Sequence, residues 1–348
     1  MSAVRVDPLG YVCINPKDTN DFRVFADLKE FLKKGEENLE LVNEVPNPIR
    51  TPVDVETLPI VREDLGEKKN VKFPLELNDS EVAFSRIEDS EINSKLIIEK
   101  FRKRFSDLGL DQKCPKYTVL TKRKVLKELL SRLAYKNGQN VAPTKRDSNR
   151  YIKDYLLYNG WLTIDKISVV GPQTPTNNNN NHNYGTDVEN YTIQRNDKCY
   201  KVFSIHVLTH RNTATRFVYP AEVDGFIHNK KTNELTPVEI KSKKLKPSRN
   251  NVTQYFDPNV GTDYLQARLG NVNKIIFAPY NENKDSNGVV TWVIRKFKES
   301  NISGEFPWYE DIRIEALIKL IEKNIDVKDV GIIIQITENA DGKLIHMK

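Results

Sequence analysis

Two stretches decide the fold: AEVDGFI at residues 221–227 and PVEIKSKK at residues 237–244. In both, apolar and β-branched residues alternate with charged ones, a pattern that predicts strands. The polar run HNKKTNE at 228–234 lies between them and predicts the turn of a β-hairpin. Because side chains two residues apart share one face of a strand, the hairpin is expected to gather its charged side chains.

These charged side chains are three acids and a lysine. Glu222 and Asp224 share a face of the first strand, and Glu239 shares a face of the second with Lys241. Converging carboxylates repel unless one is protonated or a divalent cation lies between them, and oxygen-rich clusters suit Mg²⁺ or Mn²⁺. Lys241 would then hold a water or a phosphate oxygen. Ordinary cross-strand ion pairs produce the same pattern, so both explanations stay open at this point.

The order of the surrounding elements predicts the fold class. We expect an α+β fold with mixed central β-sheets flanked by helices, in one domain over 1–348, which resembles the core of PD-(D/E)XK nucleases. Prolines and mixed charge at 36–79 predict an irregular stretch. Apolar spacing predicts helices at 19–35, 93–108, 122–135, 263–269 and 310–322. Further strands are expected at 199–208, 214–220, 273–280, 289–297 and 330–336.

A polar, low-complexity run interrupts this pattern. The polar run TPTNNNNNHNYG contains five consecutive asparagines and has no means of building a packed element. It predicts a mobile, Asn-rich insertion at about 172–186.

Composition excludes several protein classes. The net charge of +6 is compatible with a polyanionic partner, although many soluble proteins carry such a charge. Three widely spaced cysteines fit a reducing compartment rather than a disulfide framework. No run approaches the roughly 20 apolar residues of a membrane helix. We therefore expect an intracellular protein without a membrane partner.

Four separated segments, taken together, resemble the DXO family of RNA 5′-end decapping and quality-control nucleases. EVD at 222–224 and EIK at 239–241 resemble the third and fourth motifs of that family. YTVLTKRKVLKELL at 117–130 resembles the stretch that carries an arginine near the start of a helix. YLQARLGNVNKIIFAPY at 264–280 resembles the later segment whose glutamine contacts RNA. The resemblance covers roughly 119–297.

The resemblance implies a role for each matching residue. Glu222, Asp224 and Glu239 would be side-chain ligands of Mg²⁺ or Mn²⁺. The backbone carbonyl of Ile240 would complete the metal site, and Lys241 would orient the nucleophile.

The resemblance also implies a substrate and a cellular setting. Arg123 and Gln266 would bind phosphates of an RNA 5′ end. The expected activity is removal of incomplete caps or 5′ triphosphate, with 5′→3′ exonuclease action, in mRNA quality control in the nucleus. Some family members instead bind and stimulate a nuclear 5′→3′ exoribonuclease, which gives an alternative function.

One motif of the family departs from its pattern here. The second motif, before EVD, reads glycine, apolar, any, apolar, glutamate, and its best counterpart is CYKVF at 199–203. This alignment puts Cys199 at the glycine and Phe203 at the glutamate. A rival alignment uses GWLTID and Asp165. Loss of the glutamate would suit the non-catalytic alternative, so both functions stay open.

Two other groups of residues were weighed as sites. His206 and His210 share a strand face, but no third nitrogen or sulfur ligand lies nearby in the sequence. KSKKLKPSR at 241–249 leaves the hairpin directly and is the best candidate for a phosphate-backbone patch, with a solvated loop as the ordinary alternative.

Overall fold

The structure is a computed structural model. It describes residues 4–25, 27–32, 53–73, 97, 117–131, 135–136, 139–140, 154–159, 184–193, 199–211, 213, 215–245, 262–286, 290–302, 308–324, 333–338 and 344–347.

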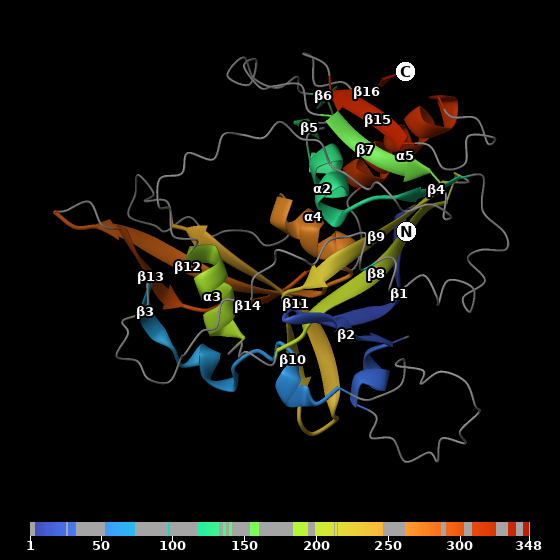
Figure 1. Cartoon of the computed structure of the whole chain (residues 1–348). Helices are drawn as coiled ribbons and strands as arrows, with labels where there is room; N and C mark the ends of the chain where they lie inside the picture. Colours follow the sequence, from blue (N-terminus) through green and yellow to red (C-terminus); the bar gives the residue numbers. More distant parts are fainter. Residues whose placement is uncertain are drawn as a thin grey trace, which may run out of the picture.

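The first of two curled sheets has eight strands, in the order β16-β15-β7-β4-β9-β8-β1-β2 (Figure 1). The β4–β9 pair is parallel, while the other pairs are antiparallel. In chain order its strands are β1 (Val4–Asn15), β2 (Asp18–Phe25), β4 (Tyr117–Leu120), β7 (Asp154–Asn159), β8 (Lys201–His210), β9 (Thr215–Val223), β15 (Ile333–Glu338) and β16 (Leu344–Met347).

The second sheet has six strands, in the order β10-β11-β12-β13-β3, with β14 also paired to β12. The β11–β12 pair is parallel, and the others are antiparallel. Its strands are β3 (Lys69–Phe73), β10 (Gly225–Asn229), β11 (Glu234–Lys244), β12 (Lys274–Lys284), β13 (Val290–Lys296) and β14 (Lys298–Asn301). A separate small pair consists of β5 (Tyr135–Lys136) and β6 (Gln139–Asn140).

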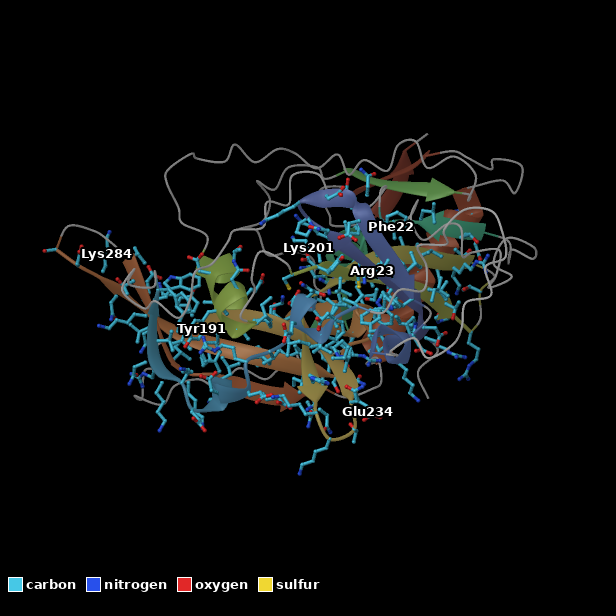
Figure 2. All side chains as sticks on the ribbon, turned by 60° about the horizontal axis from the view of Figure 1, so that its bottom comes forward. Phe22, Arg23, Tyr191, Lys201, Glu234 and Lys284 are labelled. Atoms are coloured by element: carbon cyan, nitrogen blue, oxygen red, sulfur yellow. The ribbon has the colours of Figure 1, made fainter. Side chains whose placement is uncertain are left out.

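Helices cover both sheets. The described helices are α2 (Arg123–Ser131), α3 (Tyr184–Thr192), α4 (Thr262–Leu269) and α5 (Trp308–Asn324), with short 3₁₀ turns η1 (Leu28–Leu32), η3 (Val55–Thr57) and η4 (Glu63–Gly66). Leu126, Leu265 and Ile318, from α2, α4 and α5, share one buried cluster with Tyr219 of the first sheet. Tyr191 of α3 lies against the second sheet instead (Figure 2). The fold is therefore mixed α/β, and the mixed sheets and flanking helices expected from the sequence are present.

The chain passes from one sheet to the other at Asp224. Strand β9 ends at Val223, and β10 begins at Gly225 in the second sheet. The segment 221–228, predicted as a single strand, is thus divided. A Cβ at Gly225 would lie 2.8 Å from Ile193 Cγ2 and 3.2 Å from the Pro59 carbonyl oxygen, so glycine permits the close approach at this crossing.

The helix predicted at 19–35 is wrong. Residues 18–25 form β2, which pairs with β1, and among the described residues of this range only 28–32 are helical, as the 3₁₀ turn η1. Val24 and Phe25 are consecutive yet buried in two different clusters, as a strand with packed faces on both sides requires. Pairing with β1 therefore outweighs the helical spacing of the phenylalanines.

Most of the other predicted elements that fall on described residues are present. Strands expected around the hairpin and at 273–280 are present, and those expected at 289–297 and 330–336 are described from 290 and from 333. Three predicted helices are confirmed by α2, α4 and α5, although Tyr135, the predicted end of the helix at 122–135, lies in β5. The irregular stretch at 36–79 nevertheless contains β3. The predicted helix at 93–108 lies outside the described residues except for Ile97, which is helical and buried.

The predicted Asn-rich insertion lies largely outside the described residues. Its last three positions, 184–186, are instead the first turn of α3. That helix is anchored because Val188 is buried against Val238 and Ile240 of the second sheet. The mobility of 172–183 and the single domain stay predictions. No helix in the described part of the chain is long and apolar enough to cross a membrane.

The buried side chain of His206 in the first sheet makes the stability of the protein depend on pH. Its ring lies 2.6 Å from the Ser204 hydroxyl, packs near Tyr219, and burial together with Arg123 lowers its pKa to about 3. The unfolded chain takes up a proton below about pH 6.5 while the folded chain does not, so stability should fall by about 1.4 kcal/mol per pH unit below that point.

We expect His206→Gln to remove this part of the pH dependence. Between pH 7.5 and pH 5.0, the free energy of unfolding measured in urea should fall by about 2 kcal/mol more in the wild type than in the variant. The control is His228→Gln, because His228 is also a strand histidine but is only partly buried. Equal losses in the wild type and His206→Gln would contradict the prediction.

Candidate active site

The hairpin places Asp224 beside Glu239. Strands β10 and β11 pair from Asn229↔Glu234 to Gly225↔Val238, and β10 goes no further. Because the backbone turns away to the first sheet there, the side chain of Asp224 accepts the next hydrogen bond, from the Ile240 N–H at 2.8 Å. The predicted hairpin and the approach of its two acids are therefore confirmed.

Glu239 is the most enclosed of the acids, with 1% of its side chain exposed. Its Oε2 lies 2.9 Å from Arg123 Nη1, and its Oε1 contacts Lys241 Nζ and accepts from Gln266 Nε2. Burial works against its charge, but Arg123 and Lys241 together hold the pKa of this carboxyl well below its usual value. Glu239 is therefore an ionised, fully partnered carboxylate.

Asp224 is in the opposite electrostatic situation. Its side chain is 12% exposed and lies 3.7 Å from Lys241 Nζ. Burial, followed by repulsion from Glu239 and Glu189, raises its pKa well above the usual value, although Lys241 and Arg123 oppose that shift. The site thus contains a carboxylate whose charge is destabilised where it stands and which a cation would stabilise.

Arg123 and Gln266 reach Glu239 from two helices. Arg123 is the first residue of α2, and Gln266 lies in α4, where its Oε1 accepts a 2.7 Å hydrogen bond from Lys127 of α2. Burial opposes the charge of Arg123, but the acids of the site outweigh it and raise the pKa of the guanidinium. A Cβ at Gly270 would lie 3.2 Å from Arg123 Nη1, so a glycine after α4 leaves room for this side chain.

Glu222 lies at the edge of this group. Its side chain is 36% exposed, and its Oε1 lies 3.5 Å from Nζ of Lys201, a buried lysine in β8. It is close enough to Arg123 to contribute to the raised pKa of that residue. Sequence reasoning missed Lys201, although the run CYKVF places it two residues from Phe203 and therefore on the same strand face.

Phe203 does not lie among the acids of the site. Phe203 pairs with Glu222 across β8 and β9, but it belongs to an apolar cluster with Val12 and Leu120. It is therefore part of the core. A different glutamate, Glu189 of α3, is near enough to Asp224 to raise its pKa.

The signal for Glu189 was present in the sequence. The run GTDVE at 185–189 matches glycine, any residue, apolar and glutamate of the motif, with Thr186 in the first apolar position. It was hidden because it directly follows the Asn-rich run. The rival residue Asp165 lies outside the described residues.

The donor chemistry of the site fits a hard divalent cation. Carboxylate oxygens are the ligands that Mg²⁺ and Mn²⁺ prefer, and the raised pKa of Asp224 indicates charge that a cation would stabilise. As the side chains stand, however, no three His, Cys, Asp or Glu residues in the described ranges are grouped closely enough to hold a metal. The negative charge of the acids is instead balanced by three cations, Arg123, Lys201 and Lys241.

The remaining candidates contribute little to this site. His206 and His210 are buried, and His206 contacts Ser204. Of the basic run 241–249, residues up to 245 are described: Lys243 pairs with Asp263 at 2.7 Å, and Lys244 pairs with Glu282. The rest of that run lies outside the described residues.

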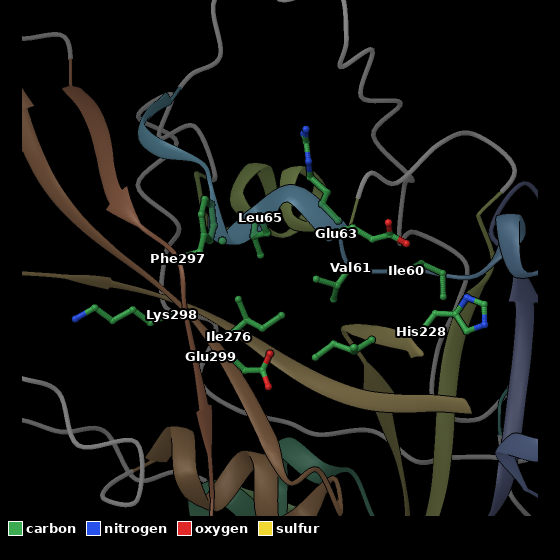
Figure 3. A pocket seen from close by; sticks show the side chains of 12 residues that line it. Ile60, Val61, Glu63, Leu65, His228, Ile276, Phe297, Lys298 and Glu299 are labelled. Carbon is green, nitrogen blue, oxygen red and sulfur yellow. The ribbon is translucent and has the colours of Figure 1, made fainter. Parts of the chain in front are cut away.

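A cavity of about 330 Å³ lies away from the carboxylates (Figure 3). Val61, Leu65 and Phe297 line it, together with Ile276, which projects from the face of the second sheet opposite Glu239. None of the proposed site residues lines this cavity, so it is no part of the candidate active site.

Comparison with known proteins bears on the fold. No protein-family model and no curated protein sequence matches the chain. The crystal structure of Scheffersomyces stipitis Rai1 matches all of this chain and 92% of that one, with 10% identity and a TM-score of 0.52. The chain has the Rai1 fold. The resemblance to the DXO family is thus supported at the level of the fold, over nearly the full chain.

Two further solved structures match with lower TM-scores. Candida albicans Rai1, solved with pU5 and Mn²⁺, matches 74% of each chain with 13% identity and a TM-score of 0.46. K. lactis Dxo1, solved with manganese, matches all of this chain and 91% of that one, with 11% identity and a TM-score of 0.47.

Proposed function

We propose that this protein is a divalent-metal-dependent hydrolase acting on RNA 5′ ends. The observation that carries the proposal is the meeting of Asp224, Glu239 and Lys241 at the point where the chain changes sheets. Two acids of opposite pKa shift beside one half-buried lysine are the arrangement expected of a functional site rather than of an ordinary ion pair. The residues of the site support phosphohydrolase chemistry. The choice of RNA as the substrate rests on the resemblance to the DXO family.

The proposed roles follow from where each side chain lies. Asp224, Glu239, Glu189 and the Ile240 carbonyl would hold Mg²⁺ or Mn²⁺, with Glu222 at the edge of the set. When bound, such a cation activates water and neutralises charge on a phosphoryl group.

The cationic side chains have separate roles. Lys241 would orient the attacking water, because its ammonium lies between Asp224 and Glu239. Arg123 and Gln266 would bind the 5′ phosphates, exchanging a contact with Glu239 for one with the substrate. The same site would carry out removal of an incomplete cap or a 5′ triphosphate and 5′→3′ exonuclease action.

A non-catalytic function is the second candidate. Glu239 is fully engaged by Arg123, Lys241 and Gln266, and no metal-holding group is assembled among the described residues. A protein with such a site would bind RNA 5′ ends and stimulate a nuclear 5′→3′ exoribonuclease without hydrolysis. Residence in the nucleus and a role in mRNA quality control belong to both proposals.

Glu189 gives a test that separates the two. We expect Glu189→Gln to lower Mn²⁺-dependent turnover of 5′-triphosphorylated RNA by at least about 100-fold, because one ligand charge is lost. Asp187→Asn is the matched control, since residues two apart on a helix face different directions.

A second variant tests the earlier alignment. Phe203→Leu keeps the apolar cluster filled and should retain turnover. Activity of Glu189→Gln equal to that of the wild type would remove Glu189 from the site. If the wild type turns over no RNA but binds it, the non-catalytic candidate is the better description.

A further inference from the structure

The two faces of the second sheet have different surroundings. Val238, Ile240 and Ile276 project from one face and pack beneath α3, through Val188 and Tyr191 (Figure 2). Glu239 and Lys241 alternate with them and project from the other face, called here the site face. The site face therefore carries the carboxylates, and α4 covers its inner part, where Ile275 and Phe277 are buried with Tyr264 and Ala267.

The site face continues outward along β11, β12, β13 and β3. The registers Lys241↔Phe277 and Lys243↔Pro279 connect β11 to β12, and Asn281↔Val293 and Val293↔Lys72 continue across β13 to β3. Alternation places Arg295 on the same face as Val293. Lys72, Asn281 and Arg295 therefore lie on one surface with Lys241; we call these three residues the outer strip.

The outer strip is basic, exposed and polar. Lys72 and Arg295 are exposed, and the Asn281 amide lies 3.1 and 3.2 Å from two nitrogens of the Arg295 guanidinium, in the orientation that lets its oxygen accept. Beyond Lys241, none of the described strand residues on the site face is acidic. The acids of the same strands, Glu282 and Glu299, project from the opposite face.

The strip lies within reach of a chain leaving the site. Successive residues on one face are about 7 Å apart along a strand, and neighbouring strands are about 4.8 Å apart. Lys243 lies between Lys241 and the strip, with 43% of its side chain exposed beside Asp263. Cations thus recur at short intervals from the carboxylates to the edge of the sheet.

We propose that the outer strip binds the phosphate backbone of the single-stranded RNA that follows the processed 5′ end. The proposal rests on the proposed function of the carboxylate site. The stacked pair Tyr280 and Trp292 projects from the opposite face, so the described part of the strip offers cations and amides but no aromatic ring for bases. Recognition is therefore electrostatic and independent of base sequence.

The test compares two double variants of the full chain. Lys72→Gln/Arg295→Gln removes two cations from the strip. Lys69→Gln/Lys296→Gln removes two cations from the same two strands, where the residues pair directly on the opposite face. Both variants lose the same charge. A melting temperature equal to that of the wild type would show that each variant is folded.

Binding of 5′-phosphorylated RNAs of 4 and 20 nucleotides is measured by fluorescence anisotropy in EDTA, over a salt series. We expect the strip variant to bind the 20-mer roughly tenfold more weakly, with a log–log salt slope shallower by about 1.4. Its affinity for the 4-mer should be unchanged. The opposite-face variant should bind both RNAs like the wild type.

Two outcomes would overturn the proposal. Equal weakening in both double variants would show a dependence on net charge alone. Unchanged 20-mer binding with weakened binding of polyglutamate would make the strip a site for an acidic protein instead. By contrast, loss of 20-mer affinity in the strip variant of a protein that turns over no RNA would support the strip and reject only the proposed hydrolase.

Discussion

Replacement of Glu239 by glutamine is expected to lower the free energy of unfolding by about 3 kcal/mol, since loss of one partner leaves buried opposite charges uncompensated. Arg123 and Lys241 both depend on this carboxylate, and Arg123 has little access to water at its position. Turnover of RNA 5′ ends should fall below detection in the same variant. Urea unfolding in EDTA and product release with Mn²⁺ measure the two effects.

Glu282→Gln is the matched control for this change. Glu282 pairs with Lys244 on the same sheet, but both side chains are partly or largely exposed, so its loss should cost less than about 1 kcal/mol. If Glu239→Gln were as stable as the wild type, Glu239 would not be the carboxylate that balances the buried cations.

Replacement of Asp224 by asparagine should have the opposite effect on stability. Burial and the nearby acids Glu239 and Glu189 raise the pKa of Asp224, so its negative charge destabilises the metal-free fold. Asparagine still accepts from the Ile240 N–H but carries no charge. We expect a gain of about 1 kcal/mol in the free energy of unfolding in EDTA, together with loss of turnover.

Added Mn²⁺ should stabilise the wild type but not Asp224→Asn. A ligand that binds only the folded state stabilises it by mass action, by about 2.7 kcal/mol at 100 times its dissociation constant. The wild type should gain this stabilisation, and Asp224→Asn should not. A destabilised Asp224→Asn in EDTA would contradict the claim that burial and the nearby acids make the charge of Asp224 unfavourable in the metal-free protein.

The hairpin and its charged residues were predictable because their determinants are local. Alternation in 221–227 and 237–244, with a polar turn between, identifies two paired strands without reference to the rest of the chain. The same alternation correctly places Glu239 and Lys241 on one face, where they contact each other.

The break at Asp224 could not be predicted in this way. Nothing in AEVDGFI signals that Val223 and Gly225 belong to different sheets, because each half has the alternation of a continuous strand. The departure of the backbone is a tertiary property, set by packing of Gly225 against Ile193 and Pro59. It explains why Glu222 meets Lys201 while Asp224 meets Ile240.

Long-range contacts account for the other omissions. Glu189 reaches the site because α3 packs on the second sheet, and its motif is masked by the adjacent asparagines. Arg123 and Gln266 were named through a family resemblance rather than through spacing. Their shared contact with Glu239 joins residues 116 and 27 positions apart in the chain. Neither could be derived from local pattern.

We propose that the carboxylates at the sheet crossing hydrolyse RNA 5′ ends with a divalent cation. Turnover of RNAs bearing a triphosphate, an unmethylated cap or a monophosphate, with Mg²⁺ or Mn²⁺, is measured for the full chain and for Glu239→Ala. We expect product from at least one of these ends that depends on the metal and disappears in the variant. Absence of product from all three, with RNA binding retained, would reject hydrolysis at this site.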